Sequence, residues 1–320
     1  MILLEDFLTI CIHGRGGGRG RGVSKEGGCG GGGMKGGSKV IEKMLELMSK
    51  LGFAAYRFSV SWSRIFPDGL GTKVNEEGVA YYNNLINALL DKGLQPYLTL
   101  YHWDLPNHLQ ESVRGWLSDK IVKCFAIYAE TCFASFGDRV KHWITLNEPL
   151  QTSVNGHDIG IFSPGRSENS STEPYLTAHY QLLAHAAPVS IYKKKFQAQQ
   201  GGEIGIVVDC EWAEPFSDKM EDKIAASRSL DFHFGWYLDP IYFGDYPKTM
   251  REKLGDRLPK FSDEDRELLR NSVDFLGINH YTTRLIAHAT TSPGYGHHYH
   301  DQQMEQIVAR IVGYPSTFAA

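Results

Sequence analysis

The sequence predicts an α/β fold, an incomplete (β/α)8 or TIM barrel with about five recognisable strand–helix units. Between residues 40 and 288, amphipathic helical segments alternate with short apolar strands, and long polar and aromatic loops follow the carboxyl ends of those strands. This alternation is typical of a parallel sheet covered by helices. Side chains gathered at the carboxyl ends of strands are the means by which such a barrel builds an active site.

The chain changes character near residue 38. Residues 14–37 are mostly glycine, and such a segment cannot offset the entropy lost on ordering. We therefore expect a flexible leader over residues 1–38 and a partial barrel domain over residues 39–320. The run GRGGGRGRG nominally matches a dinucleotide fingerprint but has no suitable strand before it and no helix directly after it. An RNA contact through this Gly/Arg leader is a minor alternative function.

The periodic part of the chain begins with a helix. Ile41, Met44, Leu45 and Met48 fall on one helical face before Gly52 ends the helix, and the strand AYRFSVSW follows at once. The same alternation predicts further helices over 76–92, 118–136, 173–199 and 262–271. The predicted strands begin near residues 55, 95, 141, 203 and 273. Aromatic or polar side chains occupy their carboxyl ends, among them Trp62, His102, Asn147, Glu148, Asn279 and Tyr281.

The composition and the net charge of the chain exclude some classes of binding partner. The formal net charge is −4 and the pI is near 6.4, so no strong field attracts nucleic acid or an anionic membrane. The start MILLEDFLTICIHG lacks a basic n-region, and the five cysteines have no regular spacing. We expect a cytoplasmic chain that has reduced thiols and acts on a small molecule, with no nucleic acid or membrane partner.

The candidate catalytic residue lies at the end of one predicted strand. Asn147, Glu148 and Pro149 close the strand VKHWITLN, and we expect the proline to hold the preceding backbone extended. A carboxylate there points into the mouth of a barrel, where we expect Trp103 and Trp143 beside it. Cleavage of a glycosidic bond needs a carboxylic acid that protonates the leaving oxygen. Taken alone the NEP triplet is a weak signal, because a salt-bridged loop glutamate has the same sequence.

Five segments together resemble the family-1 retaining β-glycosidases. AYRFSVSWSRIFPDG, PYLTLYHWDLP, HWITLNEP, CEWAEP and DFLGINHYT stand in that family's order over about 250 residues, and their details most resemble plant β-glucosidases. The resemblance implies hydrolysis of β-glucosides in carbohydrate metabolism by a retaining mechanism, without a cofactor or metal. It implies that Glu148 is the acid/base, that His102 and Asn147 bind sugar hydroxyls, and that Arg57, Asn279 and Tyr281 support the nucleophilic carboxylate.

A retaining mechanism needs a second carboxylate, which attacks the anomeric carbon. In the family this glutamate lies in a TENG-like motif, and no such motif occurs in the 320 residues. Asp104, Glu211 and Glu214 lie in or beside strand-end loops, but none matches the position of the nucleophile. The family's first strand and its sugar-binding glutamine are also unrecognisable. We therefore expect a truncated chain with weak or no turnover, and a catalytically dead sugar-binding protein is the alternative.

Two other motifs are set aside. GHHYHD at 296–301 has ligand-type side chains, but we interpret it as a polar loop after the last strand. The sequon that begins at Asn169 matters only in a secreted protein.

Overall fold

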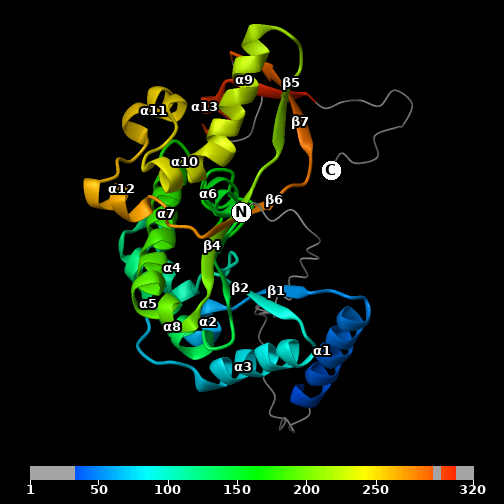
Figure 1. Cartoon of the computed structure of the whole chain (residues 1–320). Coiled ribbons are helices and arrows are strands. Elements are labelled where there is room, and N and C mark those ends of the chain that lie inside the picture. Colours follow the sequence, from blue (N-terminus) through cyan, green and yellow to red (C-terminus); the bar gives the residue numbers. More distant parts are fainter. Residues whose placement is uncertain (1–32, 291–296, 308–320) are drawn as a thin grey trace, which may run out of the picture.

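The computed structural model describes residues 33–290 and 297–307, so most of the Gly/Arg leader lies outside the described residues. Its main feature is a five-stranded, fully parallel sheet in the order β1-β2-β3-β4-β6 (Figure 1). The strands of this sheet are β1 (Ala55–Ser59), β2 (Gln95–Tyr101), β3 (His142–Asn147), β4 (Glu203–Asp209) and β6 (Phe275–Asn279). All five lie where the sequence predicts them, and they form part of a (β/α)8 barrel.

Helices connect the strands and cover one side of the sheet (Figure 1). The predicted helices are present as α1 (Gly33–Lys50), α3 (Glu76–Asp91), α5 (Lys120–Phe136), α7 (Glu173–Ile191) and α12 (Asp263–Leu269). After α7 a π-helical turn, Tyr192–Phe196, leads into α8 (Gln197–Gln200), so the predicted helix over 173–199 is one nearly continuous helical segment. Helix α1 begins inside the segment that we expected to be leader.

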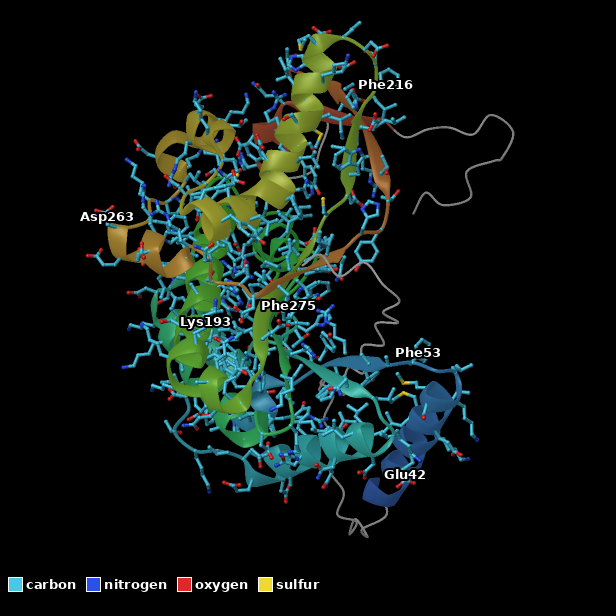
Figure 2. The ribbon with its side chains drawn as sticks, in the orientation of Figure 1. Glu42, Phe53, Lys193, Phe216, Asp263 and Phe275 are labelled. Atoms are coloured by element: carbon cyan, nitrogen blue, oxygen red, sulfur yellow. The ribbon has the colours of Figure 1, made fainter. Side chains whose placement is uncertain are left out.

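Side chains alternate between the two faces of the sheet, as the pleat requires. On the outer face, Trp143 packs edge-to-face on Phe133 of α5, with ring centroids 4.9 Å apart. On the inner face, Ile144, Val207 and Phe275 form a small buried cluster. Figure 2 places Phe275 near the middle of the molecule. The expectation that Trp143 lies beside Glu148 is therefore wrong, because Trp143 belongs to the layer between sheet and helices.

A second, three-stranded sheet was not predicted. Strands β5 (Trp212–Pro215), β7 (Thr283–His288) and β8 (Met304–Ile307) pair in that order, and the β7–β8 pair is antiparallel. Figure 2 shows Phe216, just after β5, at the far end of the molecule. Short strands that pair only through distant segments leave little periodic signal in the sequence. The remaining α-helices of the described residues are α2 (Trp62–Ile65), α4 (Asn107–Val113), α6 (Pro149–His157), α9 (Met220–Leu230), α10 (Trp236–Phe243), α11 (Lys248–Leu254) and α13 (His297–Gln302).

Helix α13 corrects the interpretation of GHHYHD as a polar loop. The backbone N–H groups of His297 and His298 donate to the Asp158 carboxylate, at 2.9 and 3.1 Å. The His298 ring is fully buried and stacks on Trp236, with centroids 5.2 Å apart. Asp158 lies 139 positions before His297 in the sequence, so no local sequence pattern predicts the start of this helix. A distant carboxylate supplies the acceptor that exposed helical N–H groups require.

Trp62 also differs from the sequence expectation. It is fully buried, its indole N–H donates to the Gly69 carbonyl at 3.1 Å, and its ring stacks on Tyr128 of α5. It is thus a core residue and not part of the barrel mouth. The Tyr128 hydroxyl lies 2.9 Å from the carbonyl oxygens of both Val60 and Leu100, to which it can donate.

We expect Tyr128→Phe to lower the free energy of unfolding by about 1–3 kcal/mol, because two buried carbonyl groups lose their shared donor. Chemical denaturation followed by circular dichroism measures this change. Tyr242→Phe is the matched control, since Tyr242 is 44% exposed and its replacement should change stability by less than about 0.5 kcal/mol. Equal effects of the two replacements would contradict a structural role for the Tyr128 hydroxyl.

Candidate active site

The site begins where strand β3 changes register. Ile144 pairs with Gly205 and Asn147 pairs with Val207, so β3 has one more residue than β4 over this interval. Such an extra residue reorients the side chains that follow it. Ile144 and Asn147 consequently both face the inner side, although they are three positions apart. Glu148 comes next and its N–H donates to the Val207 carbonyl at 2.8 Å.

The backbone of Glu148 is left-handed, with φ 44° and ψ 61°, and is not extended as the following proline led us to expect; Pro149 then starts α6. Trp103, just beyond the end of β2, is also left-handed at φ 67°. Non-glycine residues in this region cost roughly 1–3 kcal/mol each and occur where the surrounding contacts hold them. Here the Trp103 indole N–H donates to the Asn147 carbonyl at 2.9 Å. The two strained turns therefore hold each other at the carboxyl ends of β2 and β3.

The Glu148 carboxylate is buried and held by two donors. The Asn279 side-chain amide and the Tyr281 hydroxyl both donate to Glu148 Oε1, each at 2.6 Å. Partial burial and the neighbouring Glu148 carboxylate raise the pKa of Tyr281, which remains a hydrogen-bond donor. Among the described residues, Glu148 Oε2 accepts no hydrogen bond. Oε2 is therefore the oxygen left for a proton transfer.

A second group of contacts surrounds Asn147. Its side-chain oxygen accepts from the Arg57 guanidinium, and its side-chain nitrogen lies 3.2 Å from His102 Nε2. Arg57 also donates through Nε to the Thr99 hydroxyl at 3.1 Å. All six residues singled out from the sequence thus meet at one end of the sheet. Their individual roles in binding and catalysis stay predictions.

Asp209 and Gln151 were missed in the sequence. Gln151 Nε2 donates to Asp209 Oδ2 at 2.7 Å, and Asp209 is only 8% exposed. Burial raises the pKa of Asp209 to about 6, the Gln151 hydrogen bond opposes that shift, and the Glu148 charge adds to it. Asp209 ends strand β4, so the strand-end rule that found Asn147 and Asn279 also applied to it.

The other acidic residues considered as nucleophiles have partners of their own. Glu211 forms a two-pronged ion pair with Arg284 at 2.7 and 2.8 Å, and Glu214 accepts from the Trp212 indole at 2.9 Å. Asp104 accepts from the backbone N–H of His102 at 3.4 Å. Each of these carboxylates therefore already has a partner beside it in the structure.

Within the described ranges, no three His, Cys, Asp or Glu side chains are grouped so as to hold a metal ion. None of the helices in the described part of the chain is both long and apolar enough to cross a bilayer.

The chain is similar to known β-glucosidases. A β-glucosidase of Oryza sativa subsp. japonica, beta-glucosidase 4, is 66% identical over 82% of this chain and 54% of its own length. Beta-glucosidase 42 of Arabidopsis thaliana is 64% identical, again over 82% of this chain and 54% of its own length. The crystal structure of rice Os3BGlu6 beta-glucosidase matches with a TM-score of 0.81 and 47% identity over 84% of this chain and 59% of that chain.

The chain therefore spans about half the length of the curated relatives that it matches. The family model described as "Glycosyl hydrolase family 1" matches residues 39–317, which is most of the chain. With the order of the motifs and the geometry of Glu148, these matches show that the chain belongs to glycosyl hydrolase family 1.

Proposed function

We propose that this chain carries the acid/base and sugar-binding half of a β-glucosidase that cleaves small β-glucosides with retention of configuration. The observation that carries the proposal is the buried Glu148 carboxylate at the end of β3, held through Oε1 by Asn279 and Tyr281 while Oε2 accepts no hydrogen bond from the described residues. A buried carboxyl group aimed at the barrel mouth is what protonation of a glycosidic oxygen requires.

The polar side chains beside Glu148 bind the sugar. His102 and Asn147 have polar atoms on the inner side of the strand ends, where they can hydrogen-bond glucose hydroxyls. Arg57 orients Asn147 through a hydrogen bond to its side-chain oxygen. In a protein that contains the second carboxylate, Arg57 also supports that group. The TENG-like motif is absent from the 320 residues, so we propose that the chain alone turns over β-glucosides slowly or not at all. We also propose a cytoplasmic location, which the irregular spacing of the five cysteines supports.

A catalytically dead sugar-binding protein is the second candidate. The observation that favours it is the presence of the sugar-binding groups beside Glu148 in a chain without a recognisable nucleophile. In this case glucose-like inhibitors bind, but no bond is cleaved.

An external nucleophile distinguishes the two candidates. We expect the chain to release nitrophenol from 4-nitrophenyl β-glucoside at a rate that rises at least tenfold when molar azide is added. Azide attacks the anomeric carbon, the bond from that carbon to the aglycone oxygen breaks, and the proton needed by this oxygen comes from Glu148. The products are nitrophenol and an α-glucosyl azide, which chromatography identifies.

Calorimetric titration with a glucose-like inhibitor completes the test. Binding together with azide-dependent release supports the proposed half-site. Binding without release at any azide concentration supports the sugar-binding protein. Absence of both, in a chain that circular dichroism shows to be folded, contradicts the proposed function.

A further inference from the structure

Asp209 lies between the two strands that build the Glu148 site. Strand β4 is flanked by β3, which carries Glu148, and by β6, which carries Asn279, and Asp209 pairs with Asn279 in the register. Val207 and Asp209 face the same side of β4, and Val207 belongs to the inner cluster of the sheet. Asp209 therefore lies on the inner face, in the gap that the Asn279 side chain crosses to reach Glu148.

Gln151 links Asp209 to the turn that contains Glu148. Its side-chain oxygen accepts from Asn155 Nδ2 at 2.5 Å, which leaves its Nε2 to donate to Asp209 Oδ2 at 2.7 Å. Its backbone N–H donates to the Glu148 carbonyl at 3.0 Å. Helix α6 and strand β4 are also in direct contact, and they meet near the centre of Figure 1. Asp209 thus fastens the first turn of α6, directly after the left-handed Glu148.

The other oxygen of Asp209 has no such support. Oδ1 is buried and has no hydrogen-bond partner among the described residues, and Asp209 forms no ion pair with a basic side chain of the described ranges. A buried oxygen without a partner is costly when the carboxyl group is ionised. Burial accordingly raises the pKa of Asp209 to about 6, with the Glu148 charge acting in the same direction.

Several titratable groups face Asp209. They are Glu148 at the end of β3, Cys210 and Glu211 just after β4, Tyr237 on α10, Tyr281 after β6 and Tyr299 on α13. Of these, Cys210 and the three tyrosines have pKa values raised mainly by burial and stay neutral in mildly acidic solution, and Glu211 is occupied by Arg284. Within the described ranges, Glu148 forms no ion pair with a basic side chain.

We propose, on the basis of the function proposed for Glu148, that Asp209 is a positioning residue for that carboxyl group, which it serves in two ways. Through Gln151 it holds the turn that presents Glu148. Through its own ionisation it changes the charge beside Glu148, so that the Glu148 carboxyl group senses whether Asp209 carries a proton.

Carboxyl NMR of the substrate-free chain tests this coupling directly. With 13Cδ-labelled glutamate, the Glu148 signal is identified by its loss in Glu148→Gln. We expect this signal to show an inflection centred near pH 6, the range in which Asp209 titrates. Asp209→Asn should abolish the inflection. Asp239→Asn is the matched control, because burial raises the pKa of Asp239 to about 6 as well, yet Asp239 lies on α10 and is not among the main groups that shift the pKa of Asp209.

Gln151→Met distinguishes the effect of the Gln151–Asp209 hydrogen bond from the effect of the Asp209 charge. It removes the donor that favours ionised Asp209, so the inflection of the Glu148 signal should move to higher pH and persist. This variant and the wild-type titration still decide the matter if Asp209→Asn does not fold.

The coupling is refuted if the wild-type Glu148 signal has no inflection near pH 6, or if the inflection survives in Asp209→Asn. Because no substrate is present, failure of the sugar-binding and azide experiments would overturn the proposed function without altering this result.

Discussion

Replacing Glu148 with glutamine should lower the azide-dependent cleavage of an alkyl β-glucoside by about 100- to 10,000-fold, the usual contribution of a general acid. Glutamine keeps the shape of the side chain and can still accept from Asn279 and Tyr281, but it has no proton to give. The alkoxide that leaves from an alkyl glucoside is too basic to depart without protonation. The measurement is the initial rate of alcohol release at fixed azide concentration.

The leaving group supplies the internal control for this experiment. Dinitrophenolate departs without help, so cleavage of a dinitrophenyl β-glucoside should change by less than about tenfold in the same variant. Glu214→Gln makes the same chemical change at an exposed strand residue, and neither substrate should respond to it. An equal loss with both leaving groups would mean that Glu148→Gln disturbs the site as a whole, and would contradict the role of proton donor.

The sequence predicts the site best where local chemistry decides the structure. The end of a short apolar strand brought Asn147 and Glu148 to one edge of the predicted sheet, and the resemblance of five ordered segments gave Glu148 its role, since Asn-Glu-Pro alone is a weak signal. The structure places Glu148 there with Asn147, His102 and Arg57. The five parallel strands were found for a similar reason. Each is a short apolar run between amphipathic helices, and that pattern depends only on neighbouring residues.

The features that were missed depend on distant contacts. Trp143 was expected beside Glu148, but the extra residue in β3 between Ile144 and Asn147 becomes visible only when β3 is paired with β4. Helix α13 depends on Asp158, and the small sheet depends on pairing among β5, β7 and β8. Asp209 was missed for another reason. Its position was predictable, but its unpartnered oxygen is a property of the packed structure.

Acid should destabilise this fold as the pH falls below 6.5, because several histidines are buried in their neutral form. Burial lowers the pKa of His185 to about 3 and that of His179 to about 4, and it lowers the pKa of His298 well below the ordinary value. The unfolded chain binds a proton at each of these histidines near pH 6.5, whereas the folded chain does not. The stability is therefore complete above pH 6.5 and is lost as the pH falls below it.

Each such histidine removes about 1.4 kcal/mol of unfolding free energy per pH unit between pH 6.5 and its folded pKa. Asp209 and Asp239 act in the opposite sense below pH 6, since burial raises the pKa of each to about 6 and the folded chain then binds their protons more readily than the unfolded chain. Burial also raises the pKa of Asp158, and it lowers the pKa values of His157 and His233. The buried histidines therefore outnumber the carboxyl groups that oppose them. We expect a net loss of several kcal/mol between pH 6.5 and pH 4.5, measured by urea denaturation at each pH.

The slope of the unfolding free energy against pH identifies the groups responsible more securely than the total loss of free energy does. His185→Asn removes one group that titrates only in the unfolded chain, so the unfolding free energy should fall less steeply, by about 1.4 kcal/mol per pH unit between pH 6 and pH 4.5. A general loss of stability from the replacement shifts the whole curve but leaves its slope unchanged. His108→Asn, at an exposed position of α4, should keep the wild-type slope. If His185→Asn kept it too, His185 would have to be protonated in the folded chain, which would contradict its burial against Thr145.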